Sequence, residues 1–473
     1  MTHAVQTAPG GALRNKPNDA FNVRGWCPGA LRPMESGDGL IVRVRPPIGG
    51  MSIDAFAAIG ALAETHGNGH IDLTRRANLQ LRGLTTDRLP DVWQRLSELD
   101  LLDGSADAEA VRNIIVSPLA GLEAMAALNG MAVAEGLERQ LVSDSRLWAL
   151  PGKFGFLVDD GSGPTLTDVS ADVRIVAFAS QGPGDHADRG ETGWAVYGGD
   201  TAYGIADDQN IVAAAMALAR AFIDHCMPRG CRRFRDVTAH SDIALDLQRA
   251  LDLTGLLHQM TDGCAPVVGR PDTALAVRID VPFGRIEAEQ VRALTDHLAD
   301  AGDAGVETIR VSPWRALYVV CQAAMSNRVI AAARAAGLIT DASDPLLRVA
   351  ACTGKPGCPQ AHIETRDLAR RLAERLAQGS IRRAANHVFA GGAGFASGAF
   401  EVPPLSIHVS GCSKSCASSA AADLTVVGQP DGYGLNFGLT ASDATGEPVR
   451  DADDVISAID MLLAKSELED MQG

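Results

Sequence analysis

The chain has 473 residues, a formal net charge of −16 and a sequence pI of about 5.1. Nucleic-acid-binding proteins carry basic surfaces, so this charge balance argues against them and predicts no nucleic-acid partner. Hydrophobic residues make up 46% of the sequence, and we expect no apolar run to be long enough for a bilayer-spanning helix. We therefore expect large buried cores, no membrane partner and a cytoplasmic protein.

The N-terminal segment differs in composition from the rest of the chain. Residues 1–20 are polar, rich in glycine and proline, and contain no apolar core of signal-peptide length. We expect these residues to form a flexible tail.

An internal repeat follows, with residues 40–118 and 275–350 as its two copies. Each copy reads strand-helix-strand-strand-helix-strand, which is a ferredoxin-like order. Apolar residues recur at helical spacing in both first helices, and the turns Pro47–Gly49 and Pro282–Gly284 fall at matching places. Chance similarity of two α/β units is the alternative. We predict an α+β fold with internally duplicated ferredoxin-like halves at 21–118 and 271–345.

A larger α+β segment follows each half. Residues 119–270 contain predicted helices at 130–142 and 210–226 and predicted strands at 153–158, 173–179 and 194–199. Residues 346–473 contain predicted strands at 405–410, 424–428 and 434–438 and a closing helix at 453–465. These two segments are predicted to form two larger α+β domains.

Four cysteines form two close pairs in the last domain. Cys352 and Cys358 make a C-x5-C pair, and Cys412 and Cys416 make a C-x3-C pair, each directly after an apolar strand. Four thiolates from two loops are the ligand set of a [4Fe-4S] cluster, so 346–473 is predicted to be an iron–sulfur domain. A helix starting at Pro359 would favour the thiolate of the first pair through its positive end. A structural zinc site and inert core thiols are the alternatives, whereas disulfides are disfavoured.

Arginines gather around the strands of the first half although the chain is acidic. Arg43 and Arg45 lie at i, i+2 on one strand and therefore face the same side. Arg75, Arg76, Arg82 and Arg112 flank the neighbouring strands. Because the planar guanidinium pairs with carboxylates, these residues indicate a receptor for a small polyanion. Solvated side chains or pairs with local acids are the alternative.

These motifs together resemble the siroheme-dependent sulfite and nitrite reductase family. The resemblance implies the duplicated architecture and a [4Fe-4S] cluster on Cys352, Cys358, Cys412 and Cys416, with Cys416 as the bridge to siroheme iron. It also implies that basic residues grip the carboxylates of a tetrapyrrole. Matched by motif, these are Arg45, Arg76, Arg112 and Lys153.

One departure distinguishes this chain from the reductases. Gly155 stands where they have the second lysine of a K-x-K segment that begins at Lys153. In the reductases that lysine helps bind and protonate the anionic substrate. Residues 24–50 and the stretch after Cys412 are instead similar to the precorrin-3B synthases, the cobalamin-pathway branch of the superfamily.

That branch implies an O2-dependent monooxygenase that converts precorrin-3A to precorrin-3B by hydroxylation and γ-lactone formation. It further implies a mononuclear non-heme iron and an external electron donor, either NADH or a reductase or ferredoxin. The alternative is an assimilatory sulfite or nitrite reductase with siroheme as cofactor. An iron–sulfur or zinc binding module without enzymatic activity would leave the arginines unexplained.

Several residues stay without an assigned role. Cys27 reads as a packed loop thiol as readily as an active-site residue. Cys226 and Cys231 are expected to be unpaired thiols at a solvated helix end, with a second metal site as the alternative. His362 and His408 lie near the cysteine loops and could ligate iron, but most such histidines are structural. The sequence identifies no catalytic residue.

Overall fold

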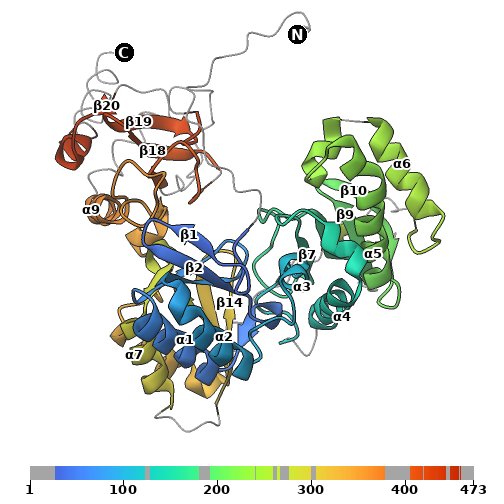
Figure 1. Cartoon of the computed structure of the whole chain (residues 1–473), viewed down its shortest axis with the longest axis horizontal. Helices are drawn as coiled ribbons and strands as arrows, with labels where there is room; N and C mark the ends of the chain where they lie inside the picture. The colour runs from blue at the N-terminus through green and yellow to red at the C-terminus, as the bar shows by residue number, and fades with distance from the viewer. Residues whose placement is uncertain are drawn as a thin grey trace, which may run out of the picture.

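The computed structural model describes residues 27–122, 128–180, 192–239, 241–258, 264–266, 276–299, 305–378, 405–418, 420–443, 448–457 and 459. The expected tail at 1–20 lies outside the described residues, as does most of the expected closing helix at 453–465, of which 453–457 and 459 are described and helical. The described part forms four sheets with helices against them, which confirms the α+β class (Figure 1).

The first two sheets belong to the repeated halves. The first has the order β1 (Met34–Ser36), β2 (Gly39–Val44), β5 (Leu79–Leu84), β4 (His70–Leu73) and β13 (Arg285–Glu287). The second has the order β12 (Ala276–Asp280), β15 (Ala316–Cys321), β14 (Val306–Val311) and β3 (Gly50–Met51). Their helices are α1 (Ile53–His66), α2 (Leu89–Glu98), α7 (Ala288–Ala299) and α8 (Ser326–Ala335). The Ser52 hydroxyl caps α1 by accepting a hydrogen bond from the Ala55 N–H at 3.1 Å.

The two halves exchange strands. β13 from the second copy pairs with β4 of the first, with Ile286 opposite Ile71, and β3 from the first copy pairs with β14 of the second. The two sheets share one hydrophobic core, in which α1 packs on α7. Gly60 permits this approach, because a Cβ there would lie 2.7 Å from Val291 Cγ1. The halves therefore form one folded unit.

Backbone conformation supports the duplication independently of the sequence pattern. Both matching turns are 3-10 turns, Pro47–Gly49 and Pro282–Gly284, with a left-handed central residue: Ile48 has φ 48° and Phe283 has φ 55°. Ala77 and Arg315 also occupy corresponding places, with φ 54° and 61°. Left-handed residues other than glycine are uncommon, so their recurrence in register indicates a repeated backbone.

The last strand of each copy does not join its own sheet. The element order is as expected, but β6 (Ile114–Val116) pairs in parallel with β7 (Phe156–Asp159) in the third sheet, and β16 (Val349–Ala351) pairs in parallel with β17 (Ile407–Ser410) in the fourth. Both strands have three residues and are largely buried, so packing in the neighbouring domain determines where they pair.

The third sheet has the order β10 (Thr201–Ala206), β9 (Thr192–Gly198), β8 (Val173–Ser180), β7 and β6, with β11 (Cys264–Pro266) beside β8. Its helices are α3 (Ala106–Val111), α4 (Gly130–Ser143), α5 (Ile211–Ala221) and α6 (Ser241–Asp252), and α5 continues into a π-helical turn at Phe222–Cys226. The expectation that no apolar run is long enough to span a bilayer is wrong for Ile211–Arg229. By length and composition alone, this helical stretch is long and apolar enough to cross a membrane. Half of that stretch is buried in the core under this sheet, which accounts for its apolar character.

The fourth sheet has the order β16, β17, β18 (Ala422–Gln429), β19 (Gly432–Leu439) and β20 (Pro448–Val449), with α9 (Arg366–Ala377) against it. Figure 1 shows this domain above the joined halves, and the domain of the third sheet beside them. Short 3-10 turns complete the described part at Thr86–Arg88, Ser145–Ala149, Met227–Arg229, Phe234–Ala239, Ala323–Met325 and Pro345–Arg348.

Candidate functional site

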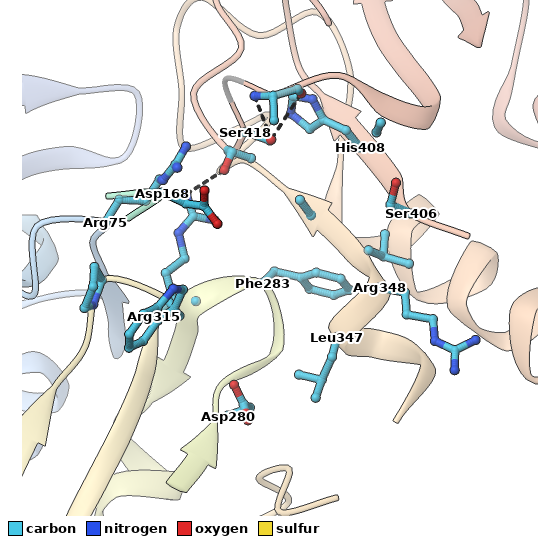
Figure 2. Close-up of a pocket in the computed structure, with 18 of the residues that line it drawn as sticks. Arg75, Asp168, Asp280, Phe283, Arg315, Leu347, Arg348, Ser406, His408 and Ser418 are labelled. Atoms are coloured by element: carbon cyan, nitrogen blue, oxygen red, sulfur yellow. Dashed lines mark hydrogen bonds between the residues drawn. The ribbon is translucent and has the colours of Figure 1, made fainter. Parts of the chain in front are cut away.

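A cavity of about 770 Å³ lies where the halves, the third-sheet domain and the cysteine domain meet (Figure 2). We call it the junction cavity. Its lining includes Arg75 and Arg76 from the β4–β5 loop and Asp168–Ser170 and Arg233 from the third-sheet domain. The second half contributes Arg278, 280–281, 283–284 and 313–315, and the cysteine domain contributes 346–350, 406–408, 417–418 and 420–422. Segments far apart in the sequence therefore build one space.

The cavity is cationic in an otherwise acidic protein. Among the described residues, its lining includes six arginines, namely Arg75, Arg76, Arg233, Arg278, Arg315 and Arg348, against two acidic side chains, Asp168 and Asp280. Arg278 is paired with Asp280, with 2.7 Å between Nη2 and Oδ1. A concave surface of one sign concentrates ligands of the opposite sign, so the cavity suits a molecule that carries several carboxylates.

Of the four basic residues matched by motif, namely Arg45, Arg76, Arg112 and Lys153, Arg76 alone lines the junction cavity. Its Nη2 donates a hydrogen bond to the carbonyl oxygen of Lys153 at 2.5 Å, and burial lowers its pKa. The Lys153 side chain is exposed and lies outside the described lining of the cavity. The backbone of Lys153 therefore positions Arg76, whereas carboxylate binding by its ammonium group stays a prediction.

Arg45 and Arg112 are engaged elsewhere in the structure. Arg45 Nη1 lies 2.7 Å from Glu109 Oε1, and both side chains are buried. Arg112 pairs with Asp103 at 2.8 Å and with Glu138 at 2.9 Å, in the wall of a separate cavity of about 400 Å³. Neither residue lines the junction cavity. The structure does not bring the four basic residues together, and tetrapyrrole binding by these two stays a prediction.

Gly155 lies directly beside Arg76. A Cβ at this position would be 3.4 Å from Arg76 Nη1 and 3.5 Å from the carbonyl oxygen of Asn113. The Gly155 N–H donates to Asp172 Oδ2 at 3.0 Å, and Asp172 also pairs with Arg233 at 2.8 Å. The position that holds a lysine in the reductases thus leaves space at a guanidinium group in this chain.

The two cysteine loops are held against each other by backbone hydrogen bonds. The Gly411 N–H donates to Cys352 Sγ at 3.1 Å, and the His362 N–H donates to the carbonyl oxygen of Gly411 at 2.7 Å. The expectation that a helix begins at Pro359 is wrong, because the helix after Cys358, α9, begins only at Arg366. Residues 359–365 form turns whose N–H and C=O groups bond the loops instead, so no helix terminus lies at Cys358.

The four thiols are close enough to influence one another. Cys416 is exposed at the loop surface, yet desolvation by the surrounding protein raises the pKa of its thiol, Lys414 opposes this shift, and Cys352, Cys412 and Cys358 add to it. Burial also raises the pKa of Cys412, to which Cys352 and Cys358 contribute. The eight cysteines whose side chains are described are all free thiols.

This donor set fits a cluster better than a single ion. Among the described residues no group of three or more His, Cys, Asp or Glu side chains is placed around one metal ion, as a closed tetrahedral zinc site requires. Four thiols from two facing loops, in C-x5-C and C-x3-C pairs, are the ligand set of a cubane cluster. The residues present therefore fit a [4Fe-4S] cluster.

Arg315 connects the cavity to the cysteine loops. Its Nη2 donates to the carbonyl oxygen of Ala417 at 3.3 Å, and Ala417 both follows Cys416 and lines the cavity. Burial lowers the pKa of Arg315, with Arg75 adding to the effect and Asp72, Cys352 and Cys416 opposing it. A ligand in the junction cavity would therefore lie next to the loop of Cys416.

Sequence reasoning missed several lining residues. Arg233 belongs to a basic cluster near Cys231 that reads as a solvated helix end, and Arg315 takes the place of Ala77 in the second copy. The repeat alignment was the available signal for Arg315. Cys226 and Cys231 are buried in the core of the third-sheet domain, and burial raises the pKa of Cys226 to about 12. His408 is fully buried at the cavity wall.

Comparisons with known proteins agree with this architecture. The nitrite/sulfite reductase ferredoxin-like half domain matches residues 32–99. The chain is 29% identical over 421 residues to a precorrin-3B synthase of Sinorhizobium sp., covering 87% of this chain and 82% of that protein. It is 25% identical over 420 residues to a sulfite reductase [ferredoxin] of Mycobacterium tuberculosis, covering 83% and 71%.

A solved structure shows the same fold. The Mycobacterium tuberculosis NirA protein superposes with a TM-score of 0.66 at 22% identity, over 89% of this chain and 79% of that one. Fold, half-domain match and relatives point to one conclusion. The chain contains a nitrite/sulfite reductase ferredoxin-like half domain and is similar over most of its length to members of that superfamily.

Proposed function

We propose that this chain is a precorrin-3B synthase, a monooxygenase that binds precorrin-3A in the junction cavity. The reaction hydroxylates the meso carbon between rings A and D and closes a γ-lactone from the ring A acetate. One atom of O2 enters the product and the other leaves as water, which consumes two electrons and two protons from an external donor. We infer that this donor is NADH or a reductase or ferredoxin.

The observation that carries this proposal is Gly155 beside Arg76, in a chain similar over most of its length to a precorrin-3B synthase. A reductase of small oxyanions needs cationic acids that deliver protons to the departing oxygen. A glycine at this place supplies no proton. It leaves room beside a guanidinium, which suits a large substrate that enters and leaves.

The junction cavity supports a tetrapyrrole as substrate. Its volume of about 770 Å³ is in the range of ligand pockets, and its six arginines face a molecule that carries several carboxylates. Arg76 is fixed by the Lys153 carbonyl, and Arg315 by the Ala417 carbonyl. Guanidinium groups held in this way lose little freedom when a carboxylate binds.

Cys352, Cys358, Cys412 and Cys416 would hold the [4Fe-4S] cluster. When bound, such a cluster supplies electrons one at a time. The Gly411 N–H donates a hydrogen bond to Cys352 Sγ, and Arg315 places a positive charge between the cavity and the loop. For the mononuclear non-heme iron, the described residues offer no group of three ligands, so we derive no step through it.

A siroheme-dependent sulfite or nitrite reductase is the competing function, favoured by the similarity to sulfite reductases. In that case the tetrapyrrole in the junction cavity would be a resident cofactor. Visible absorption of the purified protein separates the two, because siroheme gives strong bands and a cluster alone gives a broad shoulder.

The decisive experiment is turnover of precorrin-3A under ¹⁸O2 with product analysis by mass spectrometry. We expect one labelled oxygen atom in the product and no product without O2. An unlabelled product, or equal product formation without oxygen, contradicts the proposal. Six-electron reduction of sulfite or nitrite by protein that contains siroheme would establish the competing function.

A further inference from the structure

His408 is buried without a partner for either ring nitrogen. Its exposed fraction is 0%, and neither Nδ1 nor Nε2 has a hydrogen-bond partner. Most buried polar groups in native proteins are hydrogen-bonded, and one left unsatisfied lowers stability. Two such atoms on one side chain therefore require a reason, which sequence analysis alone does not supply.

The strand directs this side chain toward the junction cavity. Ile407 and Val409 belong to the core of the cysteine domain, and alternation along β17 places His408 on the opposite face, while Ile407 borders the cavity as well. His408 pairs in register with Ala350 of β16 and with Thr425 of β18. Ala350, Ser406 and His408 all line the cavity, and Figure 2 shows His408 among the surrounding side chains.

Neighbours on the same surface do find partners. The Ser406 hydroxyl donates to Asp423 Oδ2 at 2.7 Å, and the Thr425 hydroxyl donates to the Leu439 carbonyl at 2.7 Å. Ser406 and Thr425 are therefore satisfied, whereas both ring nitrogens of His408 are not. Burial lowers the pKa of His408 to about 4, with the charge of Arg315 contributing, so the ring is neutral near pH 7 and offers one donor and one acceptor.

We propose that His408 contacts the substrate and hydrogen-bonds the tetrapyrrole bound in the junction cavity. A tetrapyrrole offers the complementary groups, carboxylate oxygens as acceptors and pyrrole N–H groups as donors. The inference rests on the proposed function, because it takes the ligand of the cavity from there. It goes beyond the cationic set by adding a neutral residue from the cysteine domain, four positions before Cys412.

A purely structural role would favour a different residue. An apolar side chain of similar size would fill the same place without burying two unsatisfied nitrogens. Replacing His408 by leucine should therefore stabilise the ligand-free protein while weakening ligand binding. A rise in the stability of the ligand-free protein together with a loss of affinity distinguishes substrate contact from a packing role.

The test measures binding of precorrin-3A under anaerobic conditions without reductant, so that no turnover occurs. The variants are His408→Leu, His408→Gln and His408→Asn, with Thr425→Val as the matched control on the next strand. We expect His408→Leu to raise the Tm of the ligand-free protein and to weaken binding by about tenfold or more. One of the two amide variants should recover part of the affinity, since Asn places a polar atom near Nδ1 and Gln near Nε2. Thr425→Val should lower Tm and leave affinity unchanged.

The other outcomes each have a definite meaning. If wild-type protein binds precorrin-3A and His408→Leu binds it equally well, the inference is wrong while the proposed function stands. If His408→Leu keeps its affinity but loses iron, the residue is a metal ligand and the inference is equally overturned. If the wild-type protein itself binds no precorrin-3A, the proposed function fails and the inference fails with it.

Discussion

Arg82 donates a hydrogen bond from Nη2 to the carbonyl oxygen of Gly357 at 2.8 Å, which joins the first half to the loop of Cys358. The same guanidinium pairs with Asp38 at 2.7 Å and with Asp72 at 3.3 Å, and its side chain is 4% exposed. Ser36 also donates to Gly357 at 2.6 Å. A cysteine loop of the last domain is thus held by strand residues that lie more than 270 positions earlier.

Arg82→Ala should loosen this loop and destabilise the protein. Removing one partner of a buried charge network costs about 3–5 kcal/mol, because the remaining carboxylates lose their compensation. We expect a lower free energy of unfolding in urea and faster bleaching of cluster absorbance in air. Arg88→Ala is the control, since its pair with Asp87 is exposed and worth little. Unchanged bleaching would show that the Gly357 contact does not support the loop.

Each of Cys352, Cys358, Cys412 and Cys416 should be needed for the cluster. Substituting any of them by alanine removes one of four thiolate ligands, so iron and sulfide content and the low-temperature EPR signal of the reduced protein should fall. Cys321→Ala, in the core of the joined halves, should retain both. Stoichiometric zinc without sulfide in anaerobically purified wild-type protein would contradict the assignment.

Arg76→Ala should weaken tetrapyrrole binding more than it affects folding. Loss of a charge-assisted hydrogen bond costs about 1.5–3 kcal/mol, or roughly 10- to 150-fold in Kd. Titration of precorrin-3A under anaerobic conditions measures the effect. Arg139→Ala, which removes a largely exposed guanidinium, is the control. Equal affinity of the Arg76 variant and wild type would remove this residue from the binding site.

Arg112→Ala should act mainly on stability. Its guanidinium is buried against Asp103 and Glu138 and also donates to the Arg45 carbonyl at 2.9 Å. Two carboxylates would lose their partner, so the free energy of unfolding should fall by about 3–5 kcal/mol. If urea unfolding is unchanged and precorrin-3A binding is lost instead, the carboxylate-binding role implied by its motif is correct.

Gly155→Lys should impair the proposed reaction. The new side chain would start about 3.4 Å from Arg76 Nη1 and place an ammonium beside a guanidinium, which repels it and fills the space. We expect weaker precorrin-3A binding, with Gly155→Ala close to wild type because the Arg76 terminus can shift. Full activity of the lysine variant would show that the space at Gly155 is not needed.

Asp72 should make stability depend on pH at the acidic end. Burial alone would raise its pKa, but Arg366, Arg285 and Arg82 hold the pKa well below its usual range. A lowered pKa contributes stability above the unfolded value of about 3.9 that is lost as the pH falls. Asp72→Asn should therefore cost about 3–5 kcal/mol at pH 7 in urea unfolding, with a smaller difference from wild type near pH 3. A difference that stays constant over this range would contradict the ionic role.

The sequence predicted features that depend on local pattern. The matching turns at Ile48 and Phe283 follow from proline and glycine at fixed offsets, and the facing cysteine loops follow from thiols placed at strand ends. Whether the helix after Cys358 begins at Pro359 or at Arg366 could not be read in the same way. His362, in the segment between Cys358 and Arg366, donates a backbone hydrogen bond to Gly411, about 50 positions away. Such long-range partners leave no signal in the local sequence.

The candidate site was less predictable because pairing partners decide what an arginine does. Arg45 and Arg76 look alike in sequence, yet one meets Glu109 and the other lines the cavity. His408 lies in an apolar strand whose alternation is visible, but only the packed domains show which face meets a cavity. Arg233 and Arg315 line the cavity from loops that come together only when the domains pack against one another.

The exchange of β3 and β13 has a consequence for the order in which the chain matures. Arg285 pairs with Asp72 across 213 positions, so the edge of β4 has no partner strand until the second copy has left the ribosome. At roughly 5–20 residues per second, that edge waits about 10–40 seconds during synthesis. An open edge is a template for wrong pairing, and chaperone protection during this interval would determine how much of the newly made protein reaches its native form.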